Sequence, residues 1–272
     1  MSAIRTVGVI GAGRMGAPII GHLARKGVTV LAHDIDQARR EVVEALGATW
    51  AGELAALARG CDAILICVGY DRELRDLLSD GGGLSGLAAG TIVAVLATVN
   101  PRTVQALAEQ ARPRGVHVID STVCRGGKAA DEGTLLSFVG GDAAVVERMK
   151  PVLACYSADI VHTGGVGTAQ VAKAANNLVM WACLIADHEA LALGQRFGID
   201  VELLRNALKT SSADNYVLRN WGVNTMAWAD DDMEIVQQMA KDAGVELAQV
   251  DLNRELCRRL KPKRFRLEEY GV

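Results

Sequence analysis

The chain has 272 residues, of which 50% are hydrophobic, 4% aromatic and 22% charged, and its formal net charge is −3. This length allows one large or two modest domains, and the small negative charge argues against nucleic acid as a partner. The sequence has no apolar stretch of about 18 uncharged residues, so we expect no membrane span. Because the first predicted strand begins near Arg5, we also expect no secretory signal.

Six cysteines are scattered along the chain, and no two of them form a C-x-x-C pair. Several lie within apolar runs, where a cysteine most often serves as a small core residue. This usage predicts a reduced, cytoplasmic protein without a zinc or other metal site. The cysteines are Cys61, Cys67, Cys124, Cys155, Cys183 and Cys257.

The first half of the chain alternates short β-branched runs with amphipathic segments. Such alternation predicts an α/β fold with a Rossmann-type, doubly wound parallel sheet. The predicted strands are Val7–Ile10, Val28–His33, Ala63–Val68, Ile92–Leu96, Val116–Ile119 and Leu135–Val139. The predicted helices between them are Pro18–Lys26, Gln37–Leu46, Arg72–Leu78, Pro101–Ala111 and Ala143–Leu153.

The pattern changes after the glycine-rich segment at residues 164–167. From there on helical patterns follow one another, and no strand-like run interrupts them. We therefore predict a dinucleotide-binding domain over residues 1–164 and an all-helical domain for substrate and oligomerisation over residues 165–272. The predicted helices of this second domain are Thr168–Phe197, Val201–Leu208, Asp232–Ala243 and Leu247–Leu260.

A glycine-rich loop, G-A-G-R-M-G, lies between the first predicted strand and the first predicted helix. In this context Gly11 allows a tight turn, Gly13 lets the backbone approach a pyrophosphate, and Gly16 lets the helix pack on the sheet. The first amides of the helix and the positive end of its dipole then face the anion. The loop therefore predicts a nicotinamide dinucleotide site. We assign to this site Gly11, Gly13, Arg14, Met15 and Gly16, together with Val68 at the end of the third predicted strand.

Asp34 follows the second predicted strand, about 20 residues beyond the glycine loop. A carboxylate there accepts hydrogen bonds from the ribose hydroxyls of NAD and repels the 2′-phosphate of NADP. The alternative is that Asp34, or Asp36 in its place, simply opens the turn before the next helix. We favour NAD because of the Asp34 carboxylate. NADP stays the alternative, because Arg39 and Arg40 on that helix are able to bind a phosphate.

Four separated segments form a larger pattern along the chain. They are G-A-G-R-M-G-A-P at 11–18, A-T-V-N-P at 97–101, D-S-T-V-C-R-G-G at 120–127 and G-V-G-T-A-Q-V-A-K-A-A-N-N at 165–177. Together they resemble the β-hydroxyacid dehydrogenase family, which includes 3-hydroxyisobutyrate and tartronate semialdehyde enzymes. The resemblance implies hydride transfer between NAD(H) and a small 3-hydroxy acid or its semialdehyde. It also places Thr98 beside the nicotinamide.

The fourth segment is similar to the catalytic helix of the family. The resemblance implies that Lys173 is the general acid/base and that Asn177 helps to hold the substrate. The two side chains are four residues apart on a helix and therefore share one face. The amine takes up the hydroxyl proton when hydride leaves for the nicotinamide, and it returns that proton in the reverse direction. The alternative is that Lys173 is an ordinary exposed helix lysine.

The third segment looks like the substrate loop of the family, usually D-A-P-V-S-G-G, but differs from it at two positions. Cys124 stands at the usual serine, and a thiol donates a weaker hydrogen bond to a substrate carboxylate. Arg125 stands at the first glycine, where its guanidinium either binds an acidic group of the substrate or faces solvent. We assign substrate binding to Cys124, Arg125 and Gly126, and we expect a small acidic substrate.

The helical half raises three further points. Asp231 stands where relatives usually carry a lysine near the cofactor, so substrate charge, cofactor affinity and activity level stay open. The trio Asp187-His188-Glu189 is interpreted as a surface or subunit-interface cluster, and the basic tail at residues 261–266 as solvated or subunit-contacting. By analogy with other helical domains of this type, we expect a homodimer or homotetramer.

Two other functions stay open from the sequence. An imine reductase uses a related scaffold, although the pairing of Lys173 with Asn177 argues against that activity. A cofactor-binding protein without catalysis is the second alternative, and the unusual Cys124, Arg125 and Asp231 are the residues that suggest it.

Overall fold

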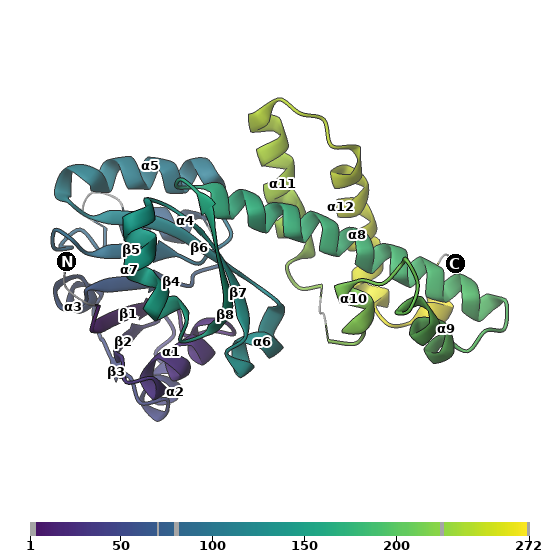
Figure 1. Cartoon of the computed structure of the whole chain (residues 1–272), viewed down its shortest axis with the longest axis horizontal. Coiled ribbons are helices and arrows are strands. Elements are labelled where there is room, and N and C mark those ends of the chain that lie inside the picture. The colour runs from purple at the N-terminus through teal and green to yellow at the C-terminus, as the bar shows by residue number, and fades with distance from the viewer. Residues whose placement is uncertain (1–3, 70, 79–81, 224–225, 271–272) are drawn as a thin grey trace. The chain divides into compact units, whose positions relative to one another are not determined.

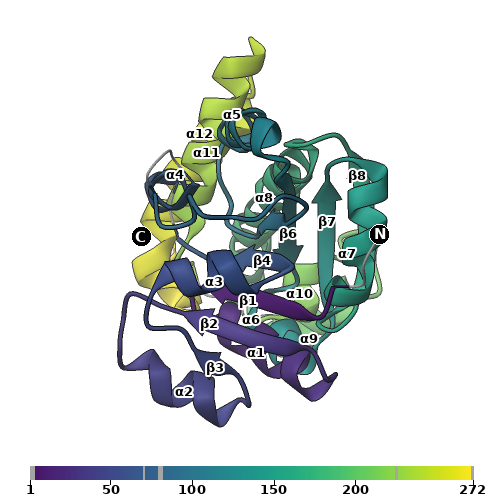
Figure 2. The same cartoon turned by 90° about the vertical axis from the view of Figure 1, so that its left-hand side faces the viewer.

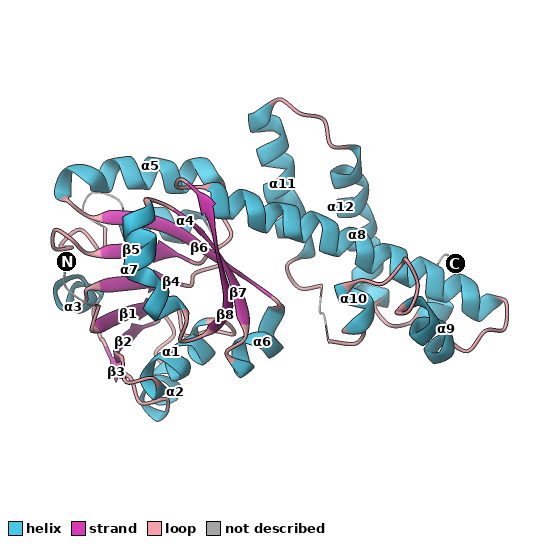
Figure 3. Ribbon diagram, in the orientation of Figure 1, coloured by secondary structure: helices cyan, strands magenta, loops and turns pink. Residues whose placement is uncertain are grey.

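The protein was analysed as a computed structural model, which describes residues 4–69, 71–78, 82–223 and 226–270 (Figure 1). The chain divides into two compact units, Met1–Lys173 and Ala174–Val272, and the division falls inside one long helix. The first unit is an α/β domain, and the described residues of the second are helices and connections (Figure 3). Each unit has hydrophobic clusters of its own.

The described strands of the first unit form one sheet. They are β1 (Thr6–Ile10), β2 (Thr29–His33), β3 (Thr49–Trp50), β4 (Ala63–Ile66), β5 (Ile92–Val95), β6 (His117–Cys124), β7 (Leu135–Gly140) and β8 (Ser157–Gly164). Their order in the sheet is β3-β2-β1-β4-β5-β6-β7-β8, and neighbours are parallel except β6 and β7. The chain changes direction across the sheet between β1 and β4, and ligands bind at such a switch point in doubly wound folds.

The alternation of side chains along the central strands gives this sheet two hydrophobic cores, one on each face. On β1, Val7 and Val9 belong to one core and Ile10 to the other, and on β4 Leu65 and Ile66 divide in the same way. Helices cover both faces (Figures 1 and 2). The first core receives α1 (Gly16–Arg25), α2 (Arg39–Ala45), α6 (Gly126–Glu132) and α7 (Ala143–Leu153), and the second receives α3 (Leu54–Gly60), α4 (Asp71–Leu78) and α5 (Pro101–Ala111).

The remaining helices build the second unit. They are α8 (Thr168–Arg196), which begins in the first unit, α9 (Val201–Leu208), α10 (Tyr216–Arg219), α11 (Ala229–Ala243) and α12 (Ala248–Leu260). Trp181 and Leu184 of α8 pack in one hydrophobic cluster with Met233 of α11 and Val250 of α12. Short 3-10 helices occur at Arg112–Arg114, Lys261–Lys263 and Leu267–Glu269.

Each strand and helix predicted from the sequence is present, most of them with somewhat different ends, and the predicted fold class is confirmed. The predictions missed β8 because its side chains are largely exposed at the edge of the sheet, so it has no apolar run. They also missed the two-residue β3, the short helices α3, α6 and α10, and the antiparallel pairing of β6 with β7.

Two interpretations of the helical half are wrong in part. Asp187 is 7% exposed and His188 is fully buried, so these two residues lie in the core of the second unit and not on its surface. Much of the basic tail is exposed, as expected, but the tail also packs on the second unit, where the backbone N–H of Phe265 donates to Nε2 of His188 at 3.1 Å. The guanidinium of Arg264 stacks 4.4 Å from the ring centre of Trp221. The positive charge of the tail suggested contact with solvent, but a guanidinium also packs favourably on the face of an aromatic ring.

Candidate cofactor and active site

The residues predicted to bind the cofactor lie at one edge of the sheet. The glycine loop follows β1, Asp34 follows β2, Val68 lies just beyond β4 and Thr98 lies just beyond β5. These strands are parallel to one another, so their carboxyl ends meet at the same edge. The topology therefore gathers distant segments of the chain around the switch point between β1 and β4.

The three glycines of the loop meet different requirements. Gly11 has a φ of +93°, and a Cβ there would lie 2.5 Å from the carbonyl oxygen of Cys67. A Cβ on Gly16 would lie 1.8 Å from the carbonyl oxygen of Gly11, so only glycine fits at the start of α1. A Cβ on Gly13 would meet nothing within 4 Å, which leaves an open cradle. This space lies next to the N-terminus of α1, whose first turn has no acidic residue, and therefore fits a pyrophosphate.

Asp34 connects the glycine loop to the end of β2. Its Oδ2 accepts a hydrogen bond from the N–H of Ala12 at 2.6 Å, and its Oδ1 accepts one from the N–H of Asp36 at 2.9 Å. The carboxylate thus shapes the turn before α2 and also stands beside the loop. Arg39 and Arg40 on α2 are both ion-paired with acidic side chains nearby.

Arg14 joins the glycine loop to α6. Its guanidinium makes two hydrogen bonds of 2.7 Å to the carboxylate of Asp131. The same guanidinium crosses Gly127, where a Cβ would come within 2.4 Å of Nη2. A second link comes from His22 of α1, whose Nε2 donates to the carbonyl oxygen of Ala130 at 3.0 Å. The side chain of Arg14 is therefore engaged with Asp131, and its contact with a cofactor stays a prediction.

The predicted substrate loop is partly a strand. β6 runs through Cys124, which is 4% exposed, and the chain then turns through Arg125 into Gly126 at the start of α6. Arg125 has a φ of +84°, a region where a non-glycine residue is strained. Its guanidinium pairs with Asp159 of β8 at 2.6 Å and donates to the carbonyl oxygen of Thr134 at 3.2 Å. An acidic group of a substrate would have to share or replace the Asp159 contact.

The first turn of α8 is fixed to β6 by a buried carboxylate. Asp120 is fully buried, and its two oxygens accept hydrogen bonds from the N–H groups of Gly167 at 2.7 Å and Gln170 at 3.0 Å. Burial raises the pKa of Asp120, whereas the hydrogen bonds to its carboxylate act in the opposite direction. The hydroxyl of Thr122 adds a hydrogen bond of 3.0 Å to the carbonyl oxygen of Ala169.

The loop that contains Thr98 is held by the same helix. The fully buried side chain of Gln170 donates through Nε2 to the carbonyl oxygen of Ala97 at 2.8 Å. Its Oε1 accepts from the N–H of Val99 at 2.9 Å. Thr98 therefore lies between two backbone groups that α8 holds directly.

Lys173 and Asn177 lie one turn apart on α8 and share a face of the helix. Lys173 is half-buried, whereas Asn177 is 2% exposed and accepts a hydrogen bond from Nδ2 of Asn176 at 3.1 Å. Lys173 is the last residue of the first unit, and Asn177 belongs to the second. Both residues of the predicted catalytic pair thus lie on one continuous helix.

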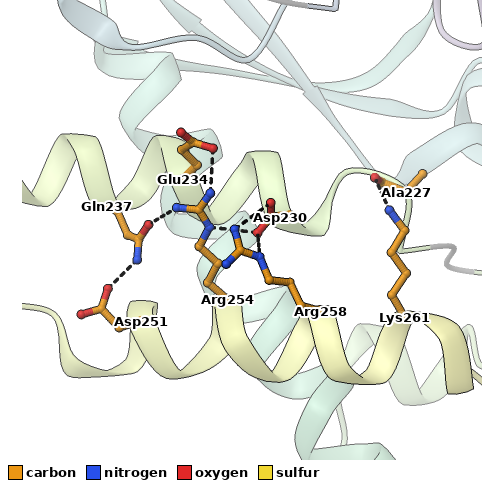
Figure 4. Close-up of polar contacts among 8 residues, drawn as sticks. All are labelled: Ala227, Asp230, Glu234, Gln237, Asp251, Arg254, Arg258 and Lys261. Atoms are coloured by element: carbon orange, nitrogen blue, oxygen red, sulfur yellow. Dashed lines mark hydrogen bonds and ion pairs between the residues drawn. The ribbon is translucent and has the colours of Figure 1, made fainter.

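Asp231 is exposed in the first turn of α11. Its neighbour Asp230 pairs with Arg254 at 2.9 Å and with Arg258 at 2.6 Å, both on α12 (Figure 4). Hydrogen bonds from these arginines lower the pKa of Asp230 to about 2. Asp230, at the start of α11, therefore joins α11 to α12, and this contact does not involve Asp231.

Neither a metal site nor a membrane-spanning helix is present among the described residues. No group of three or more His, Cys, Asp and Glu side chains in that part of the chain is arranged to hold a metal ion. None of the described helices has both the length and the apolar character needed to cross a membrane.

Comparison with known proteins identifies the family. The family model described as the NAD binding domain of 6-phosphogluconate dehydrogenase matches residues 6–165. A second, described as the NAD-binding domain of NADP-dependent 3-hydroxyisobutyrate dehydrogenase, matches residues 167–266. The chain belongs to the β-hydroxyacid dehydrogenase family.

Individual relatives agree with this assignment. The NAD-dependent L-serine dehydrogenase of Pseudomonas aeruginosa is 32% identical over 250 residues, which cover 89% of this chain and 84% of that protein. The 2-(hydroxymethyl)glutarate dehydrogenase of Eubacterium barkeri is 32% identical over 213 residues, 78% of this chain and 71% of that one. The structure of Mycobacterium tuberculosis 3-hydroxyisobutyrate dehydrogenase with L-serine has the same fold, with a TM-score of 0.86, 21% identity and coverage of 96% and 95%. The chain is thus an oxidoreductase with a site for a nicotinamide dinucleotide.

Sequence reasoning overlooked three residues that shape this region. Asp120 and Gln170 fix α8, and Asp131 binds Arg14. A signal existed for Asp120, because an aspartate within an apolar strand must find buried hydrogen-bond partners. No comparable signal marked Asp131, which is an exposed helix residue with an ordinary local pattern.

Proposed function

We propose that the protein oxidises a small 3-hydroxy acid with NAD, or reduces the corresponding semialdehyde with NADH, and that Lys173 is the general acid/base. The observation that carries this proposal is the anchoring of α8. The helix that carries Lys173 is hydrogen-bonded to the loop around Thr98, at the sheet edge that also carries the glycine cradle. The amine that transfers the proton and the cofactor that transfers the hydride must be held in fixed positions relative to each other.

The cofactor proposal rests on the glycine loop and Asp34. When bound, a nicotinamide ring supplies the hydride acceptor or donor. The open space at Gly13 and the N-terminus of α1 receive the pyrophosphate, with Met15 beside them. Asp34 receives the ribose hydroxyls, and Val68 and Thr98 line the path toward the nicotinamide. NAD is preferred to NADP because the Asp34 carboxylate repels a 2′-phosphate and the arginines of α2 already have acidic partners.

Lys173 and Asn177 divide the chemistry of the substrate hydroxyl. In the oxidation, the neutral amine of Lys173 takes the proton of the hydroxyl group while the carbon gives up hydride. In the reduction, its ammonium form returns that proton to the oxygen. The amide of Asn177, on the same face of α8, orients the substrate by hydrogen bonds.

The substrate class follows from the relatives and from the turn after β6. L-Serine and 2-(hydroxymethyl)glutarate, named for the two relatives, are both acids with a hydroxyl group on the carbon β to a carboxylate. We assign this carboxylate to the turn formed by Cys124, Arg125 and Gly126. The Arg125 guanidinium, paired with Asp159, supplies positive charge to the turn. A second acidic group on the substrate would compete with Asp159 for it.

The decisive experiment follows NADH formation with a panel of 3-hydroxy acids, in the wild type and in Lys173→Met. We expect kcat to fall by about 10²–10⁴-fold, while the Kd for NAD, measured by fluorescence titration, stays within about threefold because the lysine serves proton transfer. Lys150→Ala, which removes a lysine from α7, is the matched control and should keep normal turnover. Unchanged kcat in Lys173→Met would refute the assignment, and turnover of imines without hydroxy acids would point to an imine reductase. Cofactor binding with neither activity would indicate a non-catalytic protein.

We also propose a homodimer or homotetramer in a reducing compartment such as the cytoplasm. Val179, Leu193 and Phe197 of the second unit leave 63%, 61% and 80% of their surface exposed, and a second copy would bury them. None of the six cysteines is in a disulfide bond, which suits reducing conditions. A monomer in light scattering would contradict the oligomer.

A further inference from the structure

The side chain of Gln170 uses both ends of its amide on a single short loop. It donates to the carbonyl oxygen of Ala97 and accepts from the N–H of Val99, at 2.8 and 2.9 Å. The two partners differ in character, so the orientation of the amide is fixed: Nε2 must face the carbonyl and Oε1 must face the N–H. An apolar side chain of similar size would fill the same buried volume, but it would leave both backbone groups unpaired.

The backbone of the same residue is held from the other side. Asp120 of β6 accepts the N–H of Gln170 at 3.0 Å and that of Gly167 at 2.7 Å, and both Asp120 and Gln170 are fully buried. Gln170 therefore cannot follow a movement of the loop without breaking contacts to β6. It is the one residue of α8 described here that bonds to β6 through its backbone and to the loop around Thr98 through its side chain.

The position of Lys173 follows from this double attachment. Lys173 lies three residues after Gln170, one turn along the same helix and about 4.5 Å further along its axis. Residues three apart also lie on adjoining positions of one helix face. Within the first unit, the path from Thr98 to Lys173 thus consists of two hydrogen bonds and a single turn of helix.

We propose that Gln170 is a positioning residue, which sets the distance between the amine of Lys173 and the loop around Thr98. The proposal rests on the function proposed above, because it gives Lys173 the proton and places Thr98 beside the nicotinamide. Hydride and proton transfer need their groups in place together, and a displacement of about 1 Å costs on the order of 10²-fold in rate. Gln170 itself touches neither substrate nor cofactor in this role.

Two variants test the proposal. Gln170→Met keeps the length and volume of the side chain and removes both hydrogen bonds. Gln170→Glu keeps the acceptor for Val99, but as a carboxylate it faces the carbonyl oxygen of Ala97. When protonated, its O–H donates to that carbonyl and restores the native pattern, and burial favours this neutral form. Ser137→Ala is the control, because it breaks the buried hydrogen bond between Ser137 and Ser157 at 2.8 Å, away from α8.

The variants are assayed with whichever of L-serine, 3-hydroxyisobutyrate and 2-(hydroxymethyl)glutarate gives the wild type its highest rate with NAD. For Gln170→Met we expect kcat to fall about 10²-fold, with KM and the Kd for NAD within about threefold of the wild type. For Gln170→Glu we expect the rate relative to wild type to rise as the pH is lowered. Ser137→Ala should keep kcat and the wild-type pH profile.

Wild-type kcat in Gln170→Met would overturn the proposal. If that variant does not fold or does not bind NAD, Gln170→Glu decides: a relative rate that rises toward acid pH supports positioning, and a flat one overturns it. Lys173→Met is measured in the same series to separate the two proposals. Loss of turnover in Lys173→Met with normal turnover in Gln170→Met would remove only the positioning role, whereas normal turnover in Lys173→Met would remove the proposed function itself.

Discussion

At the scale of single residues, Arg125 combines an unfavourable backbone conformation with two side-chain contacts in the turn between β6 and α6. It occupies a left-handed backbone position, with a φ of +84°, a conformation that favours glycine. The strain of such a position is of order 1 kcal/mol or more, and an ion pair with Asp159 and a hydrogen bond to Thr134 partly offset it. The guanidinium therefore has a structural role besides the substrate contact that we propose for it.

Asp34 gives the sharpest prediction at this scale. Asp34→Ser removes the charge that we propose repels a 2′-phosphate, and it also removes the carboxylate that accepts the hydrogen bond from Ala12. We expect the ratio of kcat/KM for NADP to that for NAD to rise about tenfold or more. Steady-state kinetics with both cofactors measures this ratio.

Asp36→Ser is the control for Asp34→Ser. Asp36 lies two residues away, has a side chain that is 54% exposed and bonds within its own turn. Its replacement removes the ion pair of Arg39 but leaves the carboxylate beside the glycine loop, so we expect a smaller rise in the ratio than in Asp34→Ser. If Asp34→Ser leaves the ratio unchanged, Asp34 serves only the turn before α2.

At the scale of elements, the pair α11 and α12 is held by one acidic residue between two arginines (Figure 4). The side chain of Arg254 is only 18% exposed, and it also pairs with Glu234 at 2.7 Å. Charge-assisted bonds to a partly buried guanidinium are stronger than those at a free surface. Solvent still screens Asp230, whose side chain is 37% exposed, so the contribution of this cluster stays modest.

Asp230→Asn should lower the free energy of unfolding of the second unit by about 1 kcal/mol at neutral pH. Urea denaturation followed by tryptophan fluorescence reports mainly on this unit, since three of the four tryptophans, Trp181, Trp221 and Trp228, belong to it. Asp231→Asn changes the adjacent, exposed residue and should have almost no effect. Equal destabilisation by both substitutions would show that general charge at the N-terminus of α11 matters rather than the specific ion pairs.

At the scale of the whole molecule, buried titratable groups make stability depend on pH. His188 is fully buried beside the tail, and burial, followed by the charge of Arg264, lowers its pKa from 6.5 to about 4. Above pH 6.5 the imidazole is neutral whether the chain is folded or unfolded. As the pH falls below 6.5, His188 is protonated in the unfolded chain but stays neutral in the folded protein. The free energy of unfolding therefore decreases progressively until about pH 4.

We expect this single group to account for about 3 kcal/mol of lost stability between those limits. Urea denaturation at a series of pH values measures the loss. His188→Gln should make the curve flatter, because the amide oxygen is able to accept the bond from Phe265 and has no charge to gain. His117→Gln removes an exposed histidine and is the matched control. A curve in His188→Gln that is as steep as in the wild type would assign the acid sensitivity to other groups.

The doubly wound sheet, the helical second half and the nucleotide loop could be predicted from the amino-acid sequence. These features depend on local rules: the period of apolar residues, and glycines at Gly11 and Gly16 where a Cβ would collide with the backbone. The roles of Lys173 and Asn177 came from a family resemblance and remain predictions.

Other features depend on the three-dimensional fold: the partners of Asp120, Gln170 and Arg14, and the packing of His188 against the basic tail. Each of these contacts joins residues far apart in the sequence, and neither local propensity nor charge specifies them. The partner is set by which strand ends and helices the fold brings to the same place. Burial then makes each such hydrogen bond obligatory, because an unpaired polar group in the core is costly.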